Sequence, residues 1–518
     1  MQHPSSWWYA VQWLWEFCTQ NGLRWHVKAV GLYVCILSTN IKPKRLRWGY
    51  AQILALPKMT EPNEAKVQVL LDIINSSAHQ AIAEYKKTGH GVPGIDAGTL
   101  HPLDFATDAL ALRKAIRLLE GACEQLNTIL APPQYTAHNF INNYNWACID
   151  VALQSRIADV LDKHPQGLSV DALANAVDHS KAKIARVLRV LALKGCFKEV
   201  KRDVFANTRL SLMLKSTNNV AAYIGQFPKH VAALYGTMMD KEFAKSGEVE
   251  KPPRASNVRK EGNNNSFWET DGERLDIFHR GMAGYSEIQC SSAVLHYYPW
   301  DNVSSVVDVG SGTGAMSIPL TKMFPHLRIT NQDLPGALEM ARNVSSDIRS
   351  SPNGQVMFIF DQAWEKNAPE ALLGGHIEFV PLNFWEESPV VGKDVYYLRN
   401  IIHDWPDNES MVILHNIRKV MGPNSRVLIH ECVLLRNFEE PDVGANEFSK
   451  DHKAPDDTLL NFGSHTAYQL DLLMWLAFNG KERTLNEFKT IAASAGLALT
   501  QTYDLVGTML LEFRIAQD

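Results

Sequence analysis

A short apolar segment, followed at once by a glycine-rich loop, constrains this chain more than any other feature. Residues 305–309 predict a buried strand, residues 310–314 read Gly-Ser-Gly-Thr-Gly, and a helix is expected over 315–324. Glycines let a backbone turn sharply and approach a ligand, because no Cβ stands in the way. A second strand is expected over 327–331, with Asp333 just beyond it. A carboxylate at this edge of a parallel sheet can accept both hydroxyls of a ribose.

The glycine loop by itself is compatible with two classes of enzyme, one that binds a methyl donor and one that binds a nicotinamide cofactor. Gly310, Gly312 and Ala315 also satisfy the looser dinucleotide fingerprint with alanine in its third place, so a nicotinamide oxidoreductase fits the loop. Such an enzyme would need a hydride-transfer constellation such as Tyr-x-x-x-Lys, and the sequence places none on the expected sheet. The choice between a methyl donor and a nicotinamide therefore depends on residues further along the chain.

Length and composition bound the remaining possibilities. A chain of 518 residues is long enough for two or three domains, and its net charge of −5 gives no support to a dedicated nucleic-acid-binding protein. Seven cysteines are scattered without CxxC spacing, which argues against a zinc site or a disulfide scaffold and favours a reducing, cytoplasmic location. No metal is expected. From Ser304 to Asp518 strand-like and helix-like segments alternate, which predicts an α/β domain with a mostly parallel sheet.

Residues 1–58 form an atypical extension that holds six of the thirteen tryptophans. One interpretation is an interfacial membrane anchor that uses these tryptophans and the basic cluster at 42–45. The favoured interpretation is a dispensable or non-native extension, with the working protein beginning at Met59. The longest apolar run, 29–37, is too short to cross a bilayer, so no stable membrane insertion is expected.

Four further regions are expected after this extension. Residues 59–136 form a helical segment, with amphipathic helices over 67–85 and 109–130. Residues 137–225 form a winged-helix-like domain, and 226–300 a helical linker with a mobile insertion at 241–265. Residues 301–518 form the α/β domain, interrupted by a second insertion at 437–464.

The winged-helix pattern consists of three helices and a hairpin. The helices are expected over 147–161, from Ser169 to Val177 and over 181–194, with Ser169 and Ser180 as caps, and the hairpin lies at 197–207. A DNA-binding regulator is one interpretation, because the third helix carries Lys181, Lys183, Arg186 and Arg189. A dimerisation and substrate-lid module of an enzyme is the other, and the slightly acidic chain and the glycine-loop motif downstream favour it.

A histidine follows another expected strand at 394–398. His403 then faces the same crevice as the glycine loop, and an imidazole pKa near 6.5 suits a proton acceptor. Glu431 ends the strand at 426–430, and Glu482 precedes a helix that Thr484 caps with Glu487. A carboxylate beside an imidazole fixes its tautomer and stabilises the imidazolium. The plainer alternatives are a packed histidine and an acid that complements a helix dipole.

Together these segments resemble a known family. Asp308 to Gly314, Leu398 to Trp405 and Gly480 to Thr484 are similar to the motifs of plant and fungal caffeic-acid-type O-methyltransferases, which belong to the class I S-adenosylmethionine-dependent enzymes. The resemblance runs from about Phe140 to the C-terminus, and more loosely it includes the helical segment from Met59. It implies a Rossmann-like methyltransferase domain preceded by a mostly helical winged-helix dimerisation domain, and a homodimer.

The resemblance also implies a donor site for S-adenosylmethionine. The glycines would line its methionine part, Asp333 its ribose and Leu334 its adenine. Asn383 replaces the acid that the family usually carries at the adenine-side turn, and Arg399 replaces a frequent lysine. The implied donor residues are Gly310, Gly312, Gly314, Asp333, Leu334, Asn383, Phe384 and Arg399.

The acceptor side is implied in the same way. His403 would act as general base with Glu431 and Glu482 bracketing it, and Phe278, Met282 and Met474 would line the acceptor pocket, although such residues at helical spacing also suit a plain core. The expected reaction is methyl transfer to a hydroxyl of a small aromatic, secondary-metabolite acceptor. A catalytically inactive relative is the remaining alternative, since two insertions and Asn383 depart from the family pattern.

Overall fold

The computed structural model describes residues 64–141, 144–226, 272–342, 364–434, 466–478 and 480–517. The tryptophan-rich extension and both expected insertions lie outside these ranges. The chain divides into two compact units, Met1–Ala65 and Lys66–Asp518, and nearly all of the described residues belong to the second.

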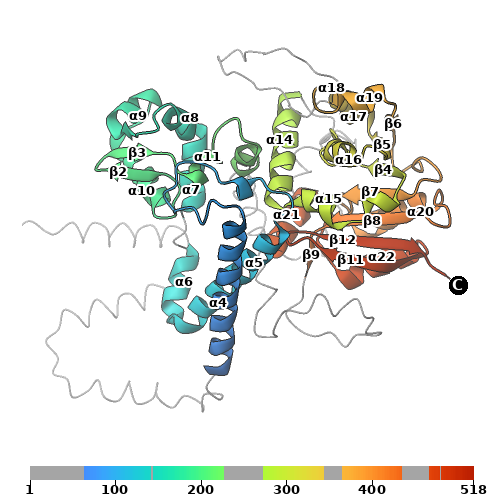
Figure 1. The fold of residues 1–518 in the computed structure, drawn as a ribbon, viewed down its shortest axis with the longest axis horizontal. Helices are drawn as coiled ribbons and strands as arrows, with labels where there is room; N and C mark the ends of the chain where they lie inside the picture. The colour runs from blue at the N-terminus through green and yellow to red at the C-terminus, as the bar shows by residue number, and fades with distance from the viewer. Residues whose placement is uncertain are drawn as a thin grey trace, which may run out of the picture. The chain divides into compact units, whose positions relative to one another are not determined.

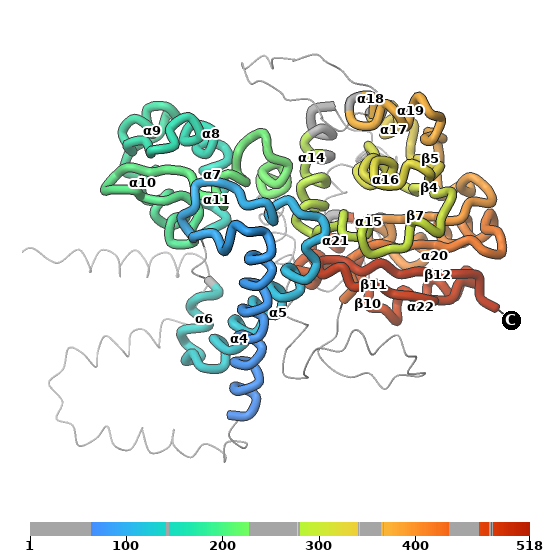
Figure 2. The backbone as a smooth tube through the Cα atoms, in the orientation of Figure 1, coloured from blue at the N-terminus to red at the C-terminus, as the bar shows by residue number. Residues whose placement is uncertain are grey.

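Two long helices open the described chain where their apolar periodicity predicts them. Helix α4 (Glu64–Lys87) and helix α5 (Leu110–Leu130) lie side by side, as Figures 1 and 2 show. Leu70 packs with Ala122, and Ala81 packs with Ala115, so the two helices share small apolar clusters. A short 3-10 turn, η2 (Pro102–Asp104), lies between them, and α6 (Pro133–Ile141) follows.

Helix α5 also forms hydrogen bonds and ion pairs with the C-terminal domain. Arg117 donates two hydrogen bonds, of 3.2 and 3.0 Å, to the carboxylate of Asp504 and a third to the carbonyl of Val506. These groups are only partly exposed, and Lys114 lies 3.5 Å from the same carboxylate. The two cations hold the pKa of Asp504 below its ordinary value despite burial. The N-terminal helices therefore complete their packing against another part of the same chain.

The next region has the expected helices and hairpin, with one break. Its elements are α7 (Asn145–Gln154), α8 (Ile157–Asp162), β1 (Leu168–Ser169), α9 (Val170–Ala176), α10 (Lys181–Ala192), β2 (Lys198–Lys201), β3 (Val204–Ala206) and α11 (Arg209–Leu212). The strands form a sheet in the order β1-β3-β2. The single helix expected over 147–161 is wrong, because Arg156 adopts a left-handed φ of 52° and separates α7 from α8. Ser169 caps α9 as expected, whereas the Ser180 side chain makes no capping bond.

A seven-stranded sheet forms the centre of the C-terminal domain (Figure 1), in the order β11-β12-β8-β7-β4-β5-β6. Strands β4 to β8 pair in parallel, and the C-terminal hairpin β11–β12 adds to β8 antiparallel. The mostly parallel sheet is therefore confirmed. The strands are β4 (Ser305–Val309), β5 (Arg328–Asp333), β6 (Ile377–Pro381), β7 (Val395–Arg399), β8 (Arg426–Glu431), β11 (Leu497–Asp504) and β12 (Met509–Ile515).

Apolar cores cover both faces of this sheet. Neighbouring residues of one strand point to opposite faces, so Tyr396 packs with Phe488 and Phe513 in one core, and Tyr397 packs with Trp300 in the other. The strands consequently read as near-continuous apolar runs, as parallel strands buried on both faces do.

The covering helices are short, and 3-10 turns join several of them. They are α14 (Gly272–Ile288), η3 (Ser291–Ala293), α15 (Val294–Tyr297), η4 (Trp300–Asn302), α16 (Ser317–Met323), α17 (Pro335–Arg342), α18 (Trp364–Asn367), α19 (Pro369–Leu373), η5 (Ile402–Asp404), α20 (Asp407–Arg418), α21 (Thr466–Phe478) and α22 (Leu485–Ser494). A separate two-stranded pair joins β9 (Val433–Leu434) to β10 (Arg483–Thr484).

The strand order fixes where a ligand can bind. Strand β4 pairs with β5 on one side and with β7 on the other, so the chain winds outward in two directions from β4. Ligands of open α/β sheets bind at such a switch point, beyond the carboxyl ends of the strands. The glycine loop follows β4 and His403 follows β7, which brings both sequence signals to one edge.

Candidate active site

The glycine loop is bonded directly to the acid of the neighbouring strand. The Gly312 N–H donates to the Asp333 carboxylate at 2.7 Å, and the Leu334 N–H donates to its other oxygen at 2.7 Å. Asp333 is the last residue of β5 rather than a loop residue beyond it. Burial raises the pKa of Asp333, and these two backbone donors oppose the rise. Each carboxylate oxygen keeps a second lone pair, so the acid can still accept hydroxyl groups.

Glycine is required at the end of this loop. Gly310, Gly312 and Gly314 all have positive φ, a conformation that other residues rarely adopt. A Cβ on Gly314 would come within 2.5 Å of the Trp364 indole nitrogen, whereas one on Gly312 would meet open space. The buried Ser311 hydroxyl has no partner within the described part of the chain. An open glycine beside an unsatisfied hydroxyl fits a loop that receives a polar ligand.

Aromatic side chains gather at the turn after β6. The Asn383 side chain accepts a 3.2 Å hydrogen bond from the Trp385 N–H, which closes the turn locally and leaves its amide protons to donate. The rings of Phe384, Trp385 and Trp405 contact one another, with centroids of the two tryptophans 4.5 Å apart. Neither tryptophan was predicted as a site residue, although Trp405 belongs to the Leu398 to Trp405 segment on which the sequence resemblance rests.

Arg399 connects the end of β7 with helix α14. It donates a 2.9 Å hydrogen bond to the Ser286 hydroxyl, which in turn donates to the carbonyl of Met282. Behind it, buried Asp308 accepts a hydrogen bond from Ser317. Burial raises the pKa of Asp308 to about 6, and the Ser317 hydrogen bond and the charge of Arg399 limit the rise.

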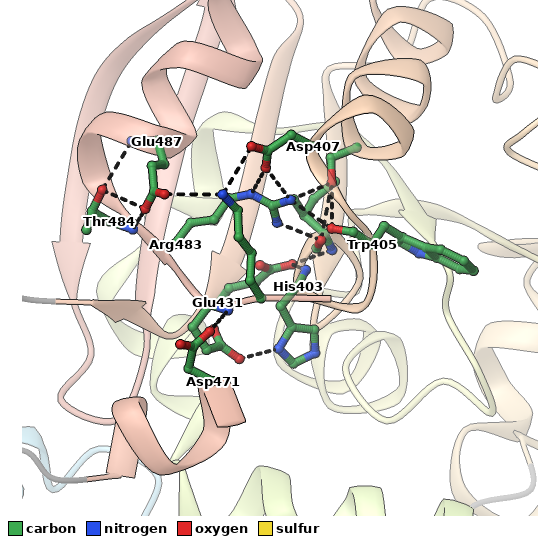
Figure 3. Close-up of polar contacts among 12 residues, drawn as sticks. His403, Trp405, Asp407, Glu431, Asp471, Arg483, Thr484 and Glu487 are labelled. Atoms are coloured by element: carbon green, nitrogen blue, oxygen red, sulfur yellow. Dashed lines mark hydrogen bonds and ion pairs between the residues drawn. The ribbon is translucent and has the colours of Figure 1, made fainter. Parts of the chain in front are cut away.

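His403 lies at the carboxyl edge with a carboxylate at each ring nitrogen. Its Nδ1 is 2.7 Å from Glu482 Oε1, and its Nε2 is 3.6 Å from the Asp404 carboxylate. Figure 3 shows one ring nitrogen of His403 bonded to a carboxylate oxygen. All three side chains are largely buried. The Glu482 contact fixes the tautomer with the proton on Nδ1, so the Nε2 lone pair is the one available to a substrate.

The carboxylates set the proton affinity of this imidazole. Burial disfavours the imidazolium, but the charges of Glu482 and Asp404 outweigh it and raise the pKa of His403 to about 10. Burial also raises the pKa of Asp404 to about 6, and the charge of His403 opposes that rise. The site therefore binds a proton at His403 more strongly than an exposed histidine would.

A neighbouring histidine has none of this capacity. His430 Nδ1 is bonded to the Tyr397 hydroxyl at 2.6 Å, and its Nε2 to the Thr508 hydroxyl at 2.7 Å. Burial lowers the pKa of His430 to about 3, so it stays neutral with both nitrogens occupied. Of these two histidines, only His403 can exchange a proton with a bound molecule.

Glu431 does not contact the imidazole. Its Oε1 accepts hydrogen bonds from the N–H groups of Ile401, Ile402 and His403, at 3.0, 2.6 and 3.4 Å. Burial raises the pKa of Glu431 to about 7, although His403 opposes this. Both glutamates were expected to lie beside the imidazole. Only Glu482 does so, whereas Glu431 binds the backbone N–H groups of the turn that carries His403.

The residues that were expected to line an acceptor pocket lie on two helices. Met282 is on α14 and Met474, which is buried, is on α21; the side chain of Phe278 lies outside the described part of the structure. Met474 packs in a cluster with Tyr285 and Cys432, and Tyr223 stacks on Tyr285 at 5.1 Å. The two tyrosines were not predicted, because no spacing signal marks residues contributed by separate helices.

The sequence predicted neither a metal site nor a membrane-spanning segment, and the structure bears on both within the described ranges. There, no three His, Cys, Asp or Glu side chains are grouped so that they could hold a metal ion. Across the same residues, no helix combines the length and the apolar character needed to cross a membrane.

The basic helix of the winged-helix region carries ion pairs. Arg189 bonds to both Glu199 and Asp203, at 2.7 and 2.8 Å, and Lys181 bonds to Asp171 at 2.6 Å. Two of the four basic residues that suggested a nucleic-acid surface are therefore neutralised by neighbours.

Known proteins resemble this chain over most of its length. The O-methyltransferase domain model matches residues 262–374 and 366–498, and the O-methyltransferase dimerisation domain model matches 141–217. The 3-O-methyltransferase 2 of Phanerochaete chrysosporium is 33% identical over 465 residues, which cover 87% of this chain and 98% of that protein.

Solved structures share the fold. Human N-acetylserotonin methyltransferase in complex with SAM has a TM-score of 0.57 at 19% identity, over 75% of this chain and 99% of that one. NcsB1, in complex with S-adenosyl-L-homocysteine and 1,4-dihydroxy-2-naphthoic acid, has a TM-score of 0.52 at 21% identity, over 73% and 98%. With the glycine loop, the acid of β5 and the histidine after β7 at one edge, the chain belongs to the class I S-adenosylmethionine-dependent O-methyltransferase family.

Proposed function

We propose that this enzyme transfers the methyl group of S-adenosylmethionine to a hydroxyl of a small aromatic acceptor, with His403 as general base. The observation that carries the proposal is the buried His403–Glu482 pair at the sheet edge that also holds the glycine loop and Asp333. A proton acceptor beside a nucleoside-type site is what such a transfer requires.

The donor site fits the chemistry of S-adenosylmethionine. The open glycine loop would take the methionine part, Asp333 would accept the ribose hydroxyls, and the aromatic rings beside Asn383 would border the adenine. Leu334, Phe384 and Arg399 would complete the donor contacts. When bound, the donor supplies an electrophilic methyl carbon on a sulfonium.

His403 supplies the proton transfer. A phenol has a pKa near 10 and is a weak nucleophile until it loses its proton. In its neutral form, which prevails above the pKa of about 10, His403 accepts that proton at Nε2, while Glu482 at Nδ1 stabilises the imidazolium that forms. Alignment of the two substrates and removal of this proton are the contributions asked of the protein.

An aromatic acceptor suits the residues on α14 and α21. Met282 and Met474 would contact its ring, and the stacked Tyr223 and Tyr285 offer flat apolar area beside them. NcsB1, which shares the fold, forms a complex with a dihydroxynaphthoic acid, and this supports a phenolic acceptor class here.

Calorimetry tests the donor assignment directly. Titrating the full-length protein with S-adenosylmethionine, S-adenosylhomocysteine and NADPH should show binding of the two sulfur nucleosides and none of NADPH. A screen of phenols with the saturated enzyme would then identify the acceptor class. Binding of NADPH alone, or of none of the three, would contradict the roles proposed for Asp333 and the glycine loop.

A homodimer is the proposed assembly. The matched dimerisation region begins beside several exposed apolar side chains, and such clusters mark interaction surfaces. These are Leu130, Tyr135, Phe140, Tyr144 and Trp146, of which Phe140 is 79% exposed. Light scattering coupled to size exclusion should give twice the mass of the chain. A monomer mass at micromolar concentration would refute the dimer.

A cytoplasmic location is proposed from the cysteine chemistry. The five cysteines among the described residues are free thiols, which suits a reducing compartment: Cys123, Cys148, Cys196, Cys290 and Cys432.

A further inference from the structure

The main chain around His403 is held by side chains from two strands that belong to different sheets, β8 and β10. Glu431, at the end of β8, accepts the N–H groups of residues 401–403. Arg483, in β10, donates to the carbonyls of Ile402 at 2.9 Å and Trp405 at 2.7 Å. Figure 3 shows Arg483 lying between Asp407 and this turn. A carboxylate therefore binds the donor side of the turn and a guanidinium its acceptor side.

Arg483 is entirely buried, and because arginine is rarely buried without partners, its contacts should explain why it lies here. Its Nε and Nη2 bond to Asp407 Oδ1 at 2.9 and 2.8 Å, and Nη2 also lies 3.1 Å from the Ser410 hydroxyl. The ion pair is weak evidence for stability, because burial of the guanidinium costs desolvation and solvent screens the Asp407 carboxylate, which is 44% exposed. The geometry accounts for an arginine here, since only a planar fork of five N–H donors can reach two carbonyls, a carboxylate and a hydroxyl together.

The segment that carries Arg483 also touches His403 itself. The Lys481 N–H donates to the His403 carbonyl at 3.0 Å, and Glu482 bonds to the imidazole. Gly480 packs so closely that a Cβ would collide with the His403 carbonyl oxygen. The pairing of Val433 with Arg483 joins this segment to the strand that follows Glu431. The ring and both peptide groups of His403 are thus fixed from one connected unit.

We infer that Arg483 is a positioning residue for the methyl transfer, holding the turn at 402–405 so that His403 Nε2 faces the acceptor hydroxyl. The inference rests on the proposed role of His403 as base. Displacing a reacting group by about 1 Å can cost on the order of 10² in rate without loss of binding. Arg483 itself touches neither substrate in this assignment.

Steady-state kinetics test the inference with three variants. Arg483→Lys keeps the charge but loses the fork, and Asp407→Asn loosens the guanidinium while leaving it in place. Both should lower kcat about 10- to 100-fold, Asp407→Asn less, with KM for the most active phenol of the screen and the affinity for S-adenosylhomocysteine within about twofold. Lys481→Gln is the matched control, because its half-exposed ammonium binds the other oxygen of Asp407. It should leave kcat within about twofold.

A spectroscopic readout makes the test independent of any acceptor. In enzyme labelled with ¹³C at histidine Cε1 and saturated with S-adenosylhomocysteine, the His403 signal, assigned by its loss in His403→Gln, should shift or split in Arg483→Lys and stay unchanged in Lys481→Gln. An unchanged His403 signal in Arg483→Lys, or unchanged kcat, would overturn the inference. So would a parallel collapse of donor affinity and melting temperature in both Arg483→Lys and Asp407→Asn, which would indicate a purely structural role. If instead the proposed role of His403 were wrong, His403→Gln would retain full activity. That result distinguishes failure of the proposed function from failure of the inference about Arg483.

Discussion

Replacing His403 with glutamine should lower kcat by about 10²- to 10⁴-fold, the contribution that a positioned general base makes to a proton transfer. Glutamine is similar in size and can still hydrogen-bond to Glu482, so the turn and the donor site should persist. The affinity for S-adenosylmethionine, measured by calorimetry, should therefore remain within about threefold. The loss would appear in turnover, because the phenol would meet the donor with its proton still attached.

His415→Gln is the matched control for this substitution. His415 lies exposed on α20, away from the sheet edge, so its replacement should leave both turnover and donor affinity unchanged. Full activity of His403→Gln with the same acceptor would show that the base assignment is wrong. Loss of donor binding together with activity would instead mean that His403 supports the donor site, which the present assignment does not allow.

Local patterns predicted the parts of this site that depend on short stretches of chain. The glycine loop, the acid of β5 and the Thr484–Glu487 capping box all form where their spacing indicates. The parallel sheet follows from the alternation of strands and helices. Each of these features depends on residues a few positions apart, so sequence order and spatial order coincide.

Other features depend on long-range pairing and could not be predicted. Glu431 was expected beside the imidazole, yet it contacts backbone N–H groups, since the register of β8 against β7 sets where its side chain ends. The break between α7 and α8 at Arg156 could not be predicted, because no glycine or proline stands at that position. Arg483 lies in a motif that marks the family, but its role could not be predicted, because its partners at 402–410 are far away in the sequence.

Replacing Glu482 with glutamine should shift the pH profile in a direction that the electrostatics fix. The base acts only when His403 is neutral, so activity falls as the pH drops below the His403 pKa. The negative charge of Glu482 raises that pKa, to about 10 together with Asp404. Removing the charge lowers the pKa, and the acid limb of kcat/KM should move to lower pH by more than about one unit. The direction is the same whether or not the donor is bound, because only the Glu482 charge has changed.

In Glu482→Gln the pH-independent plateau of kcat/KM should also fall, in addition to the shift of the acid limb. A glutamine at position 482 can present either oxygen or NH₂ to Nδ1, so the tautomer with Nε2 free is no longer enforced, and the imidazolium loses its counter-ion. A plateau lowered by about 10²-fold or more is expected. Glu487→Gln removes a carboxylate from the same segment that bonds to Thr484 and Lys481 but not to the ring, and a glutamine still completes the capping box. Its acid limb should stay in place; a limb that moved equally in both variants, or toward higher pH in Glu482→Gln, would show that Glu482 does not set the proton affinity of His403.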